Sequence, residues 1–244
     1  MKLFKFLFNA TVVCLTSLVF YSCLDDNDGY SLGDLYKPEV VTLVPISETA
    51  FYFRLDDGAT FWPVNQHGYK VPKEETRVLL NFTILGDSID KYSHAIKINR
   101  IDDILTKQMA EDKGEENDSV YGTDPVRIIG MWVGDGYLNV YFEAIWGGKE
   151  KHFINLLNPN PEKPYDLEFR HNAFNDPKIY RATSIVAFDI SSIDIEEGTE
   201  SIELNVTVMD FDGEKTHKVK YTPNKEEKVS SLSFNDTVLL GISK

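Results

Sequence analysis

The sequence predicts an all-β protein with two domains, and three observations support this prediction. Apolar and polar residues alternate with a period of two from about Tyr36 onward, which is typical of strands that bury one face. Three Asp-Gly pairs lie between such strands and suit tight hairpin turns. An acidic segment without apolar periodicity, residues 113–124, divides the strands into two groups. The content of 42% apolar and 12% aromatic residues is sufficient for folded cores.

Each Asp-Gly pair predicts a hairpin with a definite register. Around Asp57-Gly58 we expect the facing residues to be Phe51, Phe53 and Leu55 with Val64, Trp62 and Thr60. Around Asp135-Gly136 we expect Ile129, Met131 and Val133 with Phe142, Val140 and Leu138. Around Asp212-Gly213 we expect Leu204, Val206 and Val208 with Tyr221, Val219 and His217. Both strands of each hairpin then turn apolar groups to one face, which a slip of one residue would prevent.

Further strands follow from the same alternation, and one segment has a helical pattern. The strands are expected at 39–44, 77–85, 95–99, 152–157, 166–170 and 182–190. A short helix is expected at 102–111, where Ile104, Leu105 and Met109 recur near one side.

The acidic linker sets the predicted domain boundaries. Residues 36–112 carry about five strands and the short helix, which suits an OB-like β-barrel. Residues 125–244 carry strands alone, which suits an antiparallel β-sandwich.

The N-terminus has the features of a secretory signal followed by a lipid-attachment cysteine. Lys2 and Lys5 precede a 15-residue apolar stretch, which is shorter than the roughly 20 residues that span a bilayer. The following Ser22-Cys23 resembles the lipobox of bacterial lipoproteins, in which the signal, here 1–22, is removed and the cysteine is acylated. Cys14 would leave with the signal, so Cys23 would be the only cysteine of the mature chain.

Residues 23–35 form an acidic tether in this interpretation. The acids after Cys23 resemble export signals that bring some lipoproteins to the outer face of the outer membrane. We therefore expect an exported, lipid-anchored protein at the cell surface. A simple solvated spacer is the alternative interpretation of the same acids.

The net charge excludes one class of partner. The chain carries 25 Lys and Arg against 39 Asp and Glu, a formal charge of −14. Loss of Lys2 and Lys5 with the signal makes this −16. Phosphate contacts need a basic surface, so we expect no nucleic-acid partner.

Several segments in this order and spacing resemble the NigD-like lipoproteins, which are secreted β-proteins of Gram-negative anaerobes. The resemblance rests on the lipobox with its acidic continuation and on the segments LYKPEVVTLVP, FYFRLDDGATFWPVN, WVGDGYLNVYFEA and KHFINLL. It implies an N-terminal OB-like domain, a C-terminal β-sandwich and an outer-membrane lipoprotein. The family name comes from a bacteriocin-immunity role, and the resemblance brings no catalytic or ligand-binding residues.

The sequence offers no catalytic, metal or cofactor motif. The five histidines are isolated, and neither H-x-x-H, C-x-x-C nor G-x-S-x-G occurs. We therefore expect a protein that is not an enzyme and has no cofactor.

Two sets of residues are candidates for recognition or modification. Trp132, Tyr137 and Tyr141 fall on the second face of the Asp135-Gly136 hairpin and form a candidate binding face for a partner or a sugar. Packing of this face against another layer is the alternative. The Asp-Ser/Thr-aliphatic pattern makes Ser88, Ser119 and Thr237 candidate O-glycosylation sites.

Function is accordingly predicted only as a class. The first hypothesis is a binding module of the cell surface with an unknown protein partner and, by family resemblance, an immunity-like role. The alternative is an accessory glycan-binding lipoprotein of a nutrient-uptake system.

Overall fold

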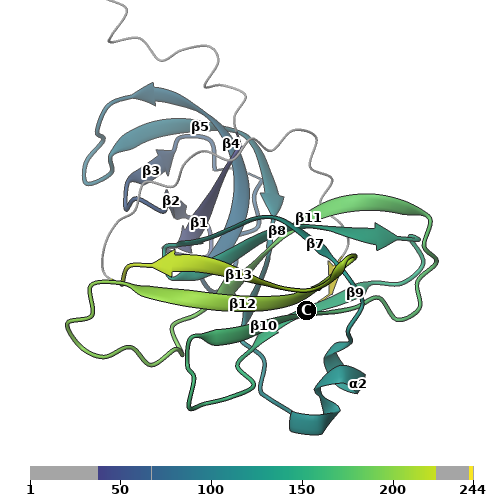
Figure 1. The fold of residues 1–244 in the computed structure, drawn as a ribbon. Helices are drawn as coiled ribbons and strands as arrows, with labels where there is room; N and C mark the ends of the chain where they lie inside the picture. The colour runs from purple at the N-terminus through teal and green to yellow at the C-terminus, as the bar shows by residue number, and fades with distance from the viewer. Residues whose placement is uncertain (1–37, 67, 224–241, 244) are drawn as a thin grey trace, which may run out of the picture. The chain divides into compact units, whose positions relative to one another are not determined.

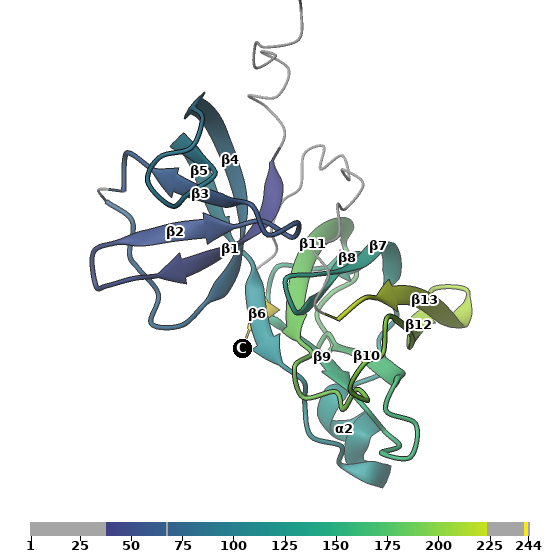
Figure 2. The same ribbon diagram turned by 90° about the vertical axis from the view of Figure 1, so that its left-hand side faces the viewer.

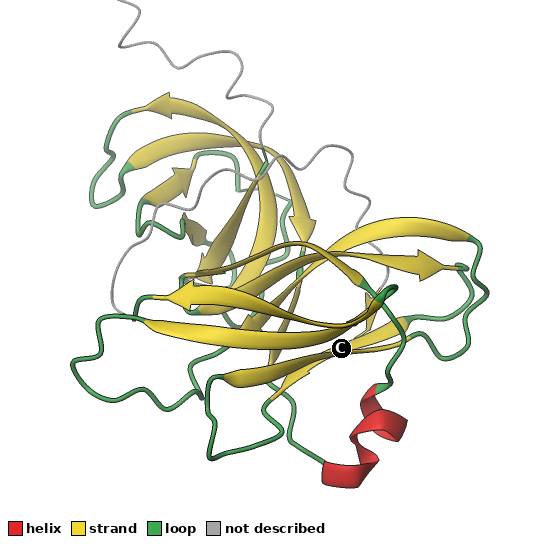
Figure 3. Ribbon diagram, in the orientation of Figure 1, coloured by secondary structure: helices red, strands yellow, loops and turns green. Residues whose placement is uncertain are grey.

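The computed structural model describes residues 38–66, 68–223 and 242–243, and their fold is all-β as predicted (Figure 1). Figure 3 shows strands joined by loops, with the helical residues confined to one short stretch. That stretch comprises η2 (Gly114–Glu116) and α2 (Asn117–Tyr121). Within the described residues, no helix is long and apolar enough to cross a membrane.

Five strands form the predicted N-terminal barrel (Figure 2). They are β1 (Glu39–Pro45), β2 (Phe51–Arg54), β3 (Thr60–Pro63), β4 (Thr76–Gly86) and β5 (His94–Asp103). The sheet closes in the order β1-β2-β3-β5-β4, with β3 parallel to β5. Alternate side chains fill the interior, among them the buried Phe51, Phe53 and Phe61. Full closure leaves the barrel without an exposed edge strand.

Two sheets form the predicted C-terminal sandwich. One contains β6 (Leu105–Gln108), β11 (Tyr180–Asp189), β8 (Tyr137–Trp146) and β7 (Arg127–Gly134), in that spatial order. The other contains β13 (Gly213–Tyr221), β12 (Ile202–Asp210), β10 (Asp166–Asn172), β9 (His152–Leu157) and β14 (Ile242–Ser243). The two inner faces share a core that includes Phe142, Phe169 and Phe188. The β6–β11, β10–β12 and β9–β14 pairs are parallel, so both sheets are mixed rather than antiparallel as predicted.

The Asp135-Gly136 hairpin has the predicted register near its turn. Asp135 and Gly136 have φ of +51° and +79°, as a type I′ turn requires. Met131 pairs with Val140 and Val133 pairs with Leu138, as expected. The prediction for Ile129 is wrong, because a β-bulge between Ile128 and Gly130 removes it from the ladder and leaves it 47% exposed.

The register predicted for the Asp57-Gly58 hairpin is wrong by one residue. Phe53 pairs with Phe61 rather than Trp62, so Phe61 points into the barrel. The cause is a three-residue loop, in which Leu55 pairs with Ala59 and Gly58 adopts a φ of +82°. Such a loop combines a turn with a left-handed glycine and shifts the pairing by one position relative to a two-residue turn.

The register predicted for the third hairpin is wrong by two residues. Its loop consists of Phe211 and Asp212, so that Asp210 pairs with Gly213 and Leu204 with Val219. A shift of two keeps the same side chains on the same face, so the predicted apolar face is retained.

The helix predicted at 102–111 is wrong. β5 continues to Asp103, and β6 occupies Leu105–Gln108. The reason is a long-range contact, because β6 pairs in parallel with β11 and this pairing overrides a weak local pattern. Strand pairing therefore passes from the barrel to the sandwich at Ile104.

Within 113–124, the phenol of Tyr121 donates a hydrogen bond to the carbonyl of Glu111 over 2.7 Å.

Candidate interaction site

The aromatic face proposed from the sequence is covered by the chain itself. Tyr137 and Tyr141 are each only 8% exposed, and with the half-buried Trp132 they pack against Val40 and Leu79 of the barrel. This corrects the expectation of an open binding face. The alternative interpretation, that this face packs against another layer, is the one that the structure shows. Burial of these large aromatic side chains between the two sheets is strongly favourable.

A buried arginine completes this joint between barrel and sandwich. Arg77 is fully buried and forms an ion pair with Asp56 at 2.6 Å. It also donates hydrogen bonds to Asn139 and Thr42 over 3.2 and 3.0 Å. The indole N–H of Trp132 donates to Asp56 over 3.0 Å. These polar contacts satisfy one another, so the joint has a structural role.

The remaining predicted residues have varied positions. Cys23 and Thr237 lie outside the described residues. Ser88 is exposed in the turn between β4 and β5. Ser119 is exposed on α2, where its hydroxyl donates to the carbonyl of Glu116 over 2.9 Å.

A different feature stands out at the end of the sandwich where β8 and β10 finish (Figure 1). We call it the loop pair: residues 147–151, which join β8 to β9, and residues 173–179, which join β10 to β11. The two loops approach closely at Gly147, where an added Cβ would lie 2.2 Å from the carbonyl oxygen of Pro177. Glycine is therefore required there.

One carboxylate ties the two loops together. Asp176, from the second loop, accepts the backbone N–H groups of four successive residues in the first loop, Gly147 through Glu150. Three of these hydrogen bonds measure 3.0–3.1 Å. Burial by itself raises the pKa of Asp176, but the backbone donors outweigh it and lower the pKa to about 2. The loops are thus fixed by an ionised, buried side chain.

Two buried histidines form a chain of contacts that ends on this carboxylate. His152 Nε2 lies 3.3 Å from Asp176, and His152 Nδ1 lies 2.8 Å from Nε2 of His171. Because a carboxylate only accepts, His152 Nε2 carries the proton, and its Nδ1 accepts from the Nε2–H of His171. The Nδ1 of a neutral His171 then carries no proton and donates no hydrogen bond to the carbonyl of Asp124. Burial, reinforced by the neighbouring His152, lowers the pKa of His171 to about 4. Burial also lowers the pKa of His152.

This chain of contacts holds the two loops in place, and no nucleophilic side chain lies at its end. His171 Nδ1 faces the backbone carbonyl of Asp124 at 3.2 Å rather than a hydroxyl or thiol. The ring of Trp146 packs on His152 with centroids 4.0 Å apart. In the described part of the chain, no group of three or more His, Cys, Asp or Glu is placed to hold a metal ion.

The loop pair and the first residue of β11 present large apolar side chains to solvent. Phe174, Ile179 and Tyr180, the first residue of β11, are 49%, 66% and 49% exposed. Phe174 and Asn175 have φ of +49° and +60°. A left-handed backbone is unfavourable for phenylalanine and persists only where the surroundings enforce it, a situation that is common at functional sites.

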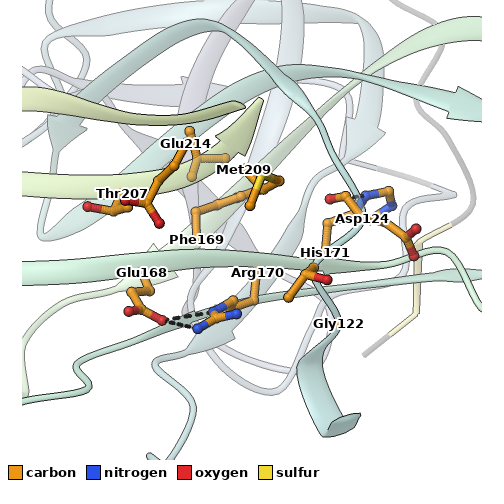
Figure 4. A pocket seen from close by; sticks show the side chains of 11 residues that line it. Gly122, Asp124, Glu168, Phe169, Arg170, His171, Thr207, Met209 and Glu214 are labelled. Atoms are coloured by element: carbon orange, nitrogen blue, oxygen red, sulfur yellow. Dashed lines mark hydrogen bonds and ion pairs between the residues drawn. The ribbon is translucent and has the colours of Figure 1, made fainter. Parts of the chain in front are cut away.

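A shallow pocket lies nearby on β10, β12 and β13 (Figure 4). Arg170, one of the charged residues that line it, forms ion pairs with Glu168 and, at 2.7 Å, with Asp118. Its charge is therefore already neutralised, and the loop pair is the better candidate for an interaction site.

Sequence reasoning missed the loop pair because its parts lie far apart in the chain. Asp176 is 29 residues from Gly147, and His171 is 19 residues from His152. The local signals were the Gly147-Gly148 pair and the Asn175-Asp176-Pro177 sequence, which mark turns but not their contact.

Comparison with known proteins gives consistent matches along the chain. Residues 40–104 match the NigD-like N-terminal OB domain, and residues 108–221 match the NigD-like C-terminal beta sandwich domain. No protein with a curated description matches.

Solved structures show the same fold. A protein from Parabacteroides distasonis, provisionally described as toxin-related, is 47% identical over 77% of this chain and 93% of its own, with a TM-score of 0.71. A protein of unknown function from Bacteroides vulgatus is 24% identical over 85% and 99%, with a TM-score of 0.68. A NigD-like immunity protein from Bacteroides caccae is 17% identical over 77% and 97%, with a TM-score of 0.60.

Proposed function

The chain belongs to the NigD-like family, and from this premise we propose that it is a non-enzymatic, lipid-anchored binding module that contacts a partner protein through the loop pair. One observation carries the proposal: Phe174, Ile179 and Tyr180 are exposed on loops that a buried carboxylate holds in place. Rigid apolar and aromatic side chains are the usual anchors of protein interfaces. Because the loops are already ordered, binding costs little conformational entropy.

An immunity role is the form of this function that the family suggests. In such a role the partner is a protein toxin, and the module neutralises it by binding. The 47% identical structure, with its toxin-related description, supports a partner of this kind.

The lipid anchor places the module at the cell surface in this proposal. We expect Cys23→Ser to move the protein from the membrane fraction to the soluble fraction, because the acylated thiol is lost and no other anchor is proposed. Fractionation of cells that express the full chain measures this. Ser22→Ala, which keeps a small residue before the cysteine, is the matched control and should stay in the membrane fraction. A Cys23→Ser protein that remains in the membrane contradicts the anchor.

Photo-cross-linking on living cells tests the proposed contact surface. A photo-reactive benzoylphenylalanine at position 174 is expected to form an adduct with a protein that mass spectrometry can identify. The same residue at position 129 is the control, since Ile129 is equally exposed, at 47% against 49% for Phe174, but lies outside the loop pair. Ile179→Ala combined with the probe at 174 is expected to lower the adduct yield severalfold.

The glycan-binding alternative has one observation of its own. The half-buried Trp62 stacks on the buried Tyr92 with centroids 5.0 Å apart, and Tyr92 contacts the half-buried Tyr52 at 5.3 Å. In OB folds, the face formed by strands 2 and 3 is the one that binds oligosaccharides. A photo-reactive residue at position 62 that captured a saccharide, with no protein captured at 174, would favour this alternative.

A further inference from the structure

The loop pair combines its apolar side chains with three lysines that have no ion-pair partner among the described residues. Lys149, Lys151 and Lys178 are exposed. The structure describes all of residues 105–223. Among the other lysines and arginines of this range, Lys107 donates to a carbonyl oxygen and Lys220 has no acid nearby. Each of the rest has a carboxylate oxygen within 4.0 Å. Three of the four unpaired cations of this region thus lie in two short loops.

These three lysines lie within two short loops of an acidic chain, and among the described barrel residues Lys70, Lys73, Lys91 and Lys97 likewise have no acid within 4.0 Å. The protein has 39 acids for 25 bases, so a surface lysine has many acids available to it. The loop pair itself contains two acids. One of them, Asp176, is buried and occupied by backbone N–H groups and His152, which leaves Glu150 as the exposed one. The three exposed lysines and the single exposed acid give the loop pair a net positive charge beside its exposed apolar side chains.

From these observations we infer that the loop pair binds a partner protein whose contact surface carries acidic side chains around an apolar pocket. The inference rests on the proposed function and names the chemistry of its partner. Complementary charges speed association and discriminate between partners, while the apolar anchors supply most of the affinity. A protein fits better than a lipid surface, because Phe174 is held in one strained conformation. A side chain held in one conformation gains affinity from a complementary pocket on a protein. It gains none from the fluid interior of a lipid bilayer.

Selection from a phage-displayed library of random 12-residue peptides tests this inference. The target is the mature chain with Cys23→Ser, and the parallel target carries Lys149→Glu, Lys151→Glu and Lys178→Glu in addition. The matched control carries Lys70→Glu, Lys73→Glu and Lys97→Glu, which makes the same charge change at exposed barrel positions. We expect peptides with net negative charge and at least one large apolar residue. They should bind the loop variant at least tenfold more weakly than the control variant, and more weakly at high salt.

The outcomes separate this inference from the proposed function. Peptides that lose binding to Phe174→Ala and to Ile179→Ala but show no acidic bias overturn the inference and leave the loop pair as the contact surface. Peptides that bind these two variants as well as the wild type overturn the proposed function itself. If no acidic peptides are enriched and the protein sediments with phosphatidylglycerol vesicles through the three lysines, the surface recognises lipid and the inference is wrong.

Discussion

Arg77→Ala is expected to lower the free energy of unfolding by about 3–5 kcal/mol, the range for removing one partner of a buried ion pair. Arg77 is fully buried between barrel and sandwich, and its loss leaves the carboxylate of Asp56 without a counter-charge. Asn139 and Thr42 lose a donor at the same time. Urea denaturation of the full mature chain, followed by tryptophan fluorescence, measures the change.

Arg100→Ala is the matched control for this substitution. Arg100 pairs with Asp102 at 2.7 Å, but its side chain is exposed, so its removal should cost less than about 1 kcal/mol. If Arg77→Ala and Arg100→Ala had the same free energy of unfolding, the buried contacts of Arg77 would not stabilise the protein.

The free energy of unfolding is expected to fall as the pH is lowered from about 6.5 to 4, and His171 is a main cause. Its pKa is about 4 in the folded protein against 6.5 in the unfolded chain, so only the unfolded chain binds the proton between these values. The stabilisation is complete above pH 6.5 and is lost progressively below it. The difference of roughly 2.5 units corresponds to about 3 kcal/mol.

The groups around His171 determine how this effect is measured. His152 and Asp124 face it, Asp176 contacts His152 on the other side, and the lowered pKa of His152 acts in the same direction. His171→Gln should therefore be less stable at pH 7 but lose less stability between pH 7 and 5 than the wild type does. Urea unfolding at each pH gives both slopes. Equal slopes for His171→Gln and the wild type would contradict the buried, neutral pair.

The sequence was most informative where a local rule determines the geometry. The Asp135-Gly136 turn needs two positive φ angles, and Met131 and Val133 accordingly pair as predicted. At Asp57-Gly58 the same dipeptide sits in a three-residue loop, and local sequence does not distinguish the two cases. Strands β1, β4, β5, β9, β10 and β11 were predicted in place because alternation reports burial directly.

The candidate site was not predictable from local sequence, because long-range contacts create it. Periodicity placed Trp132 and Tyr141 correctly on one face but could not show that the barrel covers that face. The helical pattern at 102–111 gave way to a parallel pairing of Leu105 with Val186, 81 residues away. The anchor of the loop pair likewise joins Asp176 to residues of another loop.

The yield of protein adduct at position 174 relative to position 129, measured on living cells, shows whether the loop pair is the contact surface for a partner. Both side chains are about half exposed, so a difference in yield reports partner contact rather than accessibility. We expect a ratio of at least ten, with one identified protein in the adduct at 174. Equal yields at the two positions, or no protein adduct at 174, would contradict the loop pair as the contact surface.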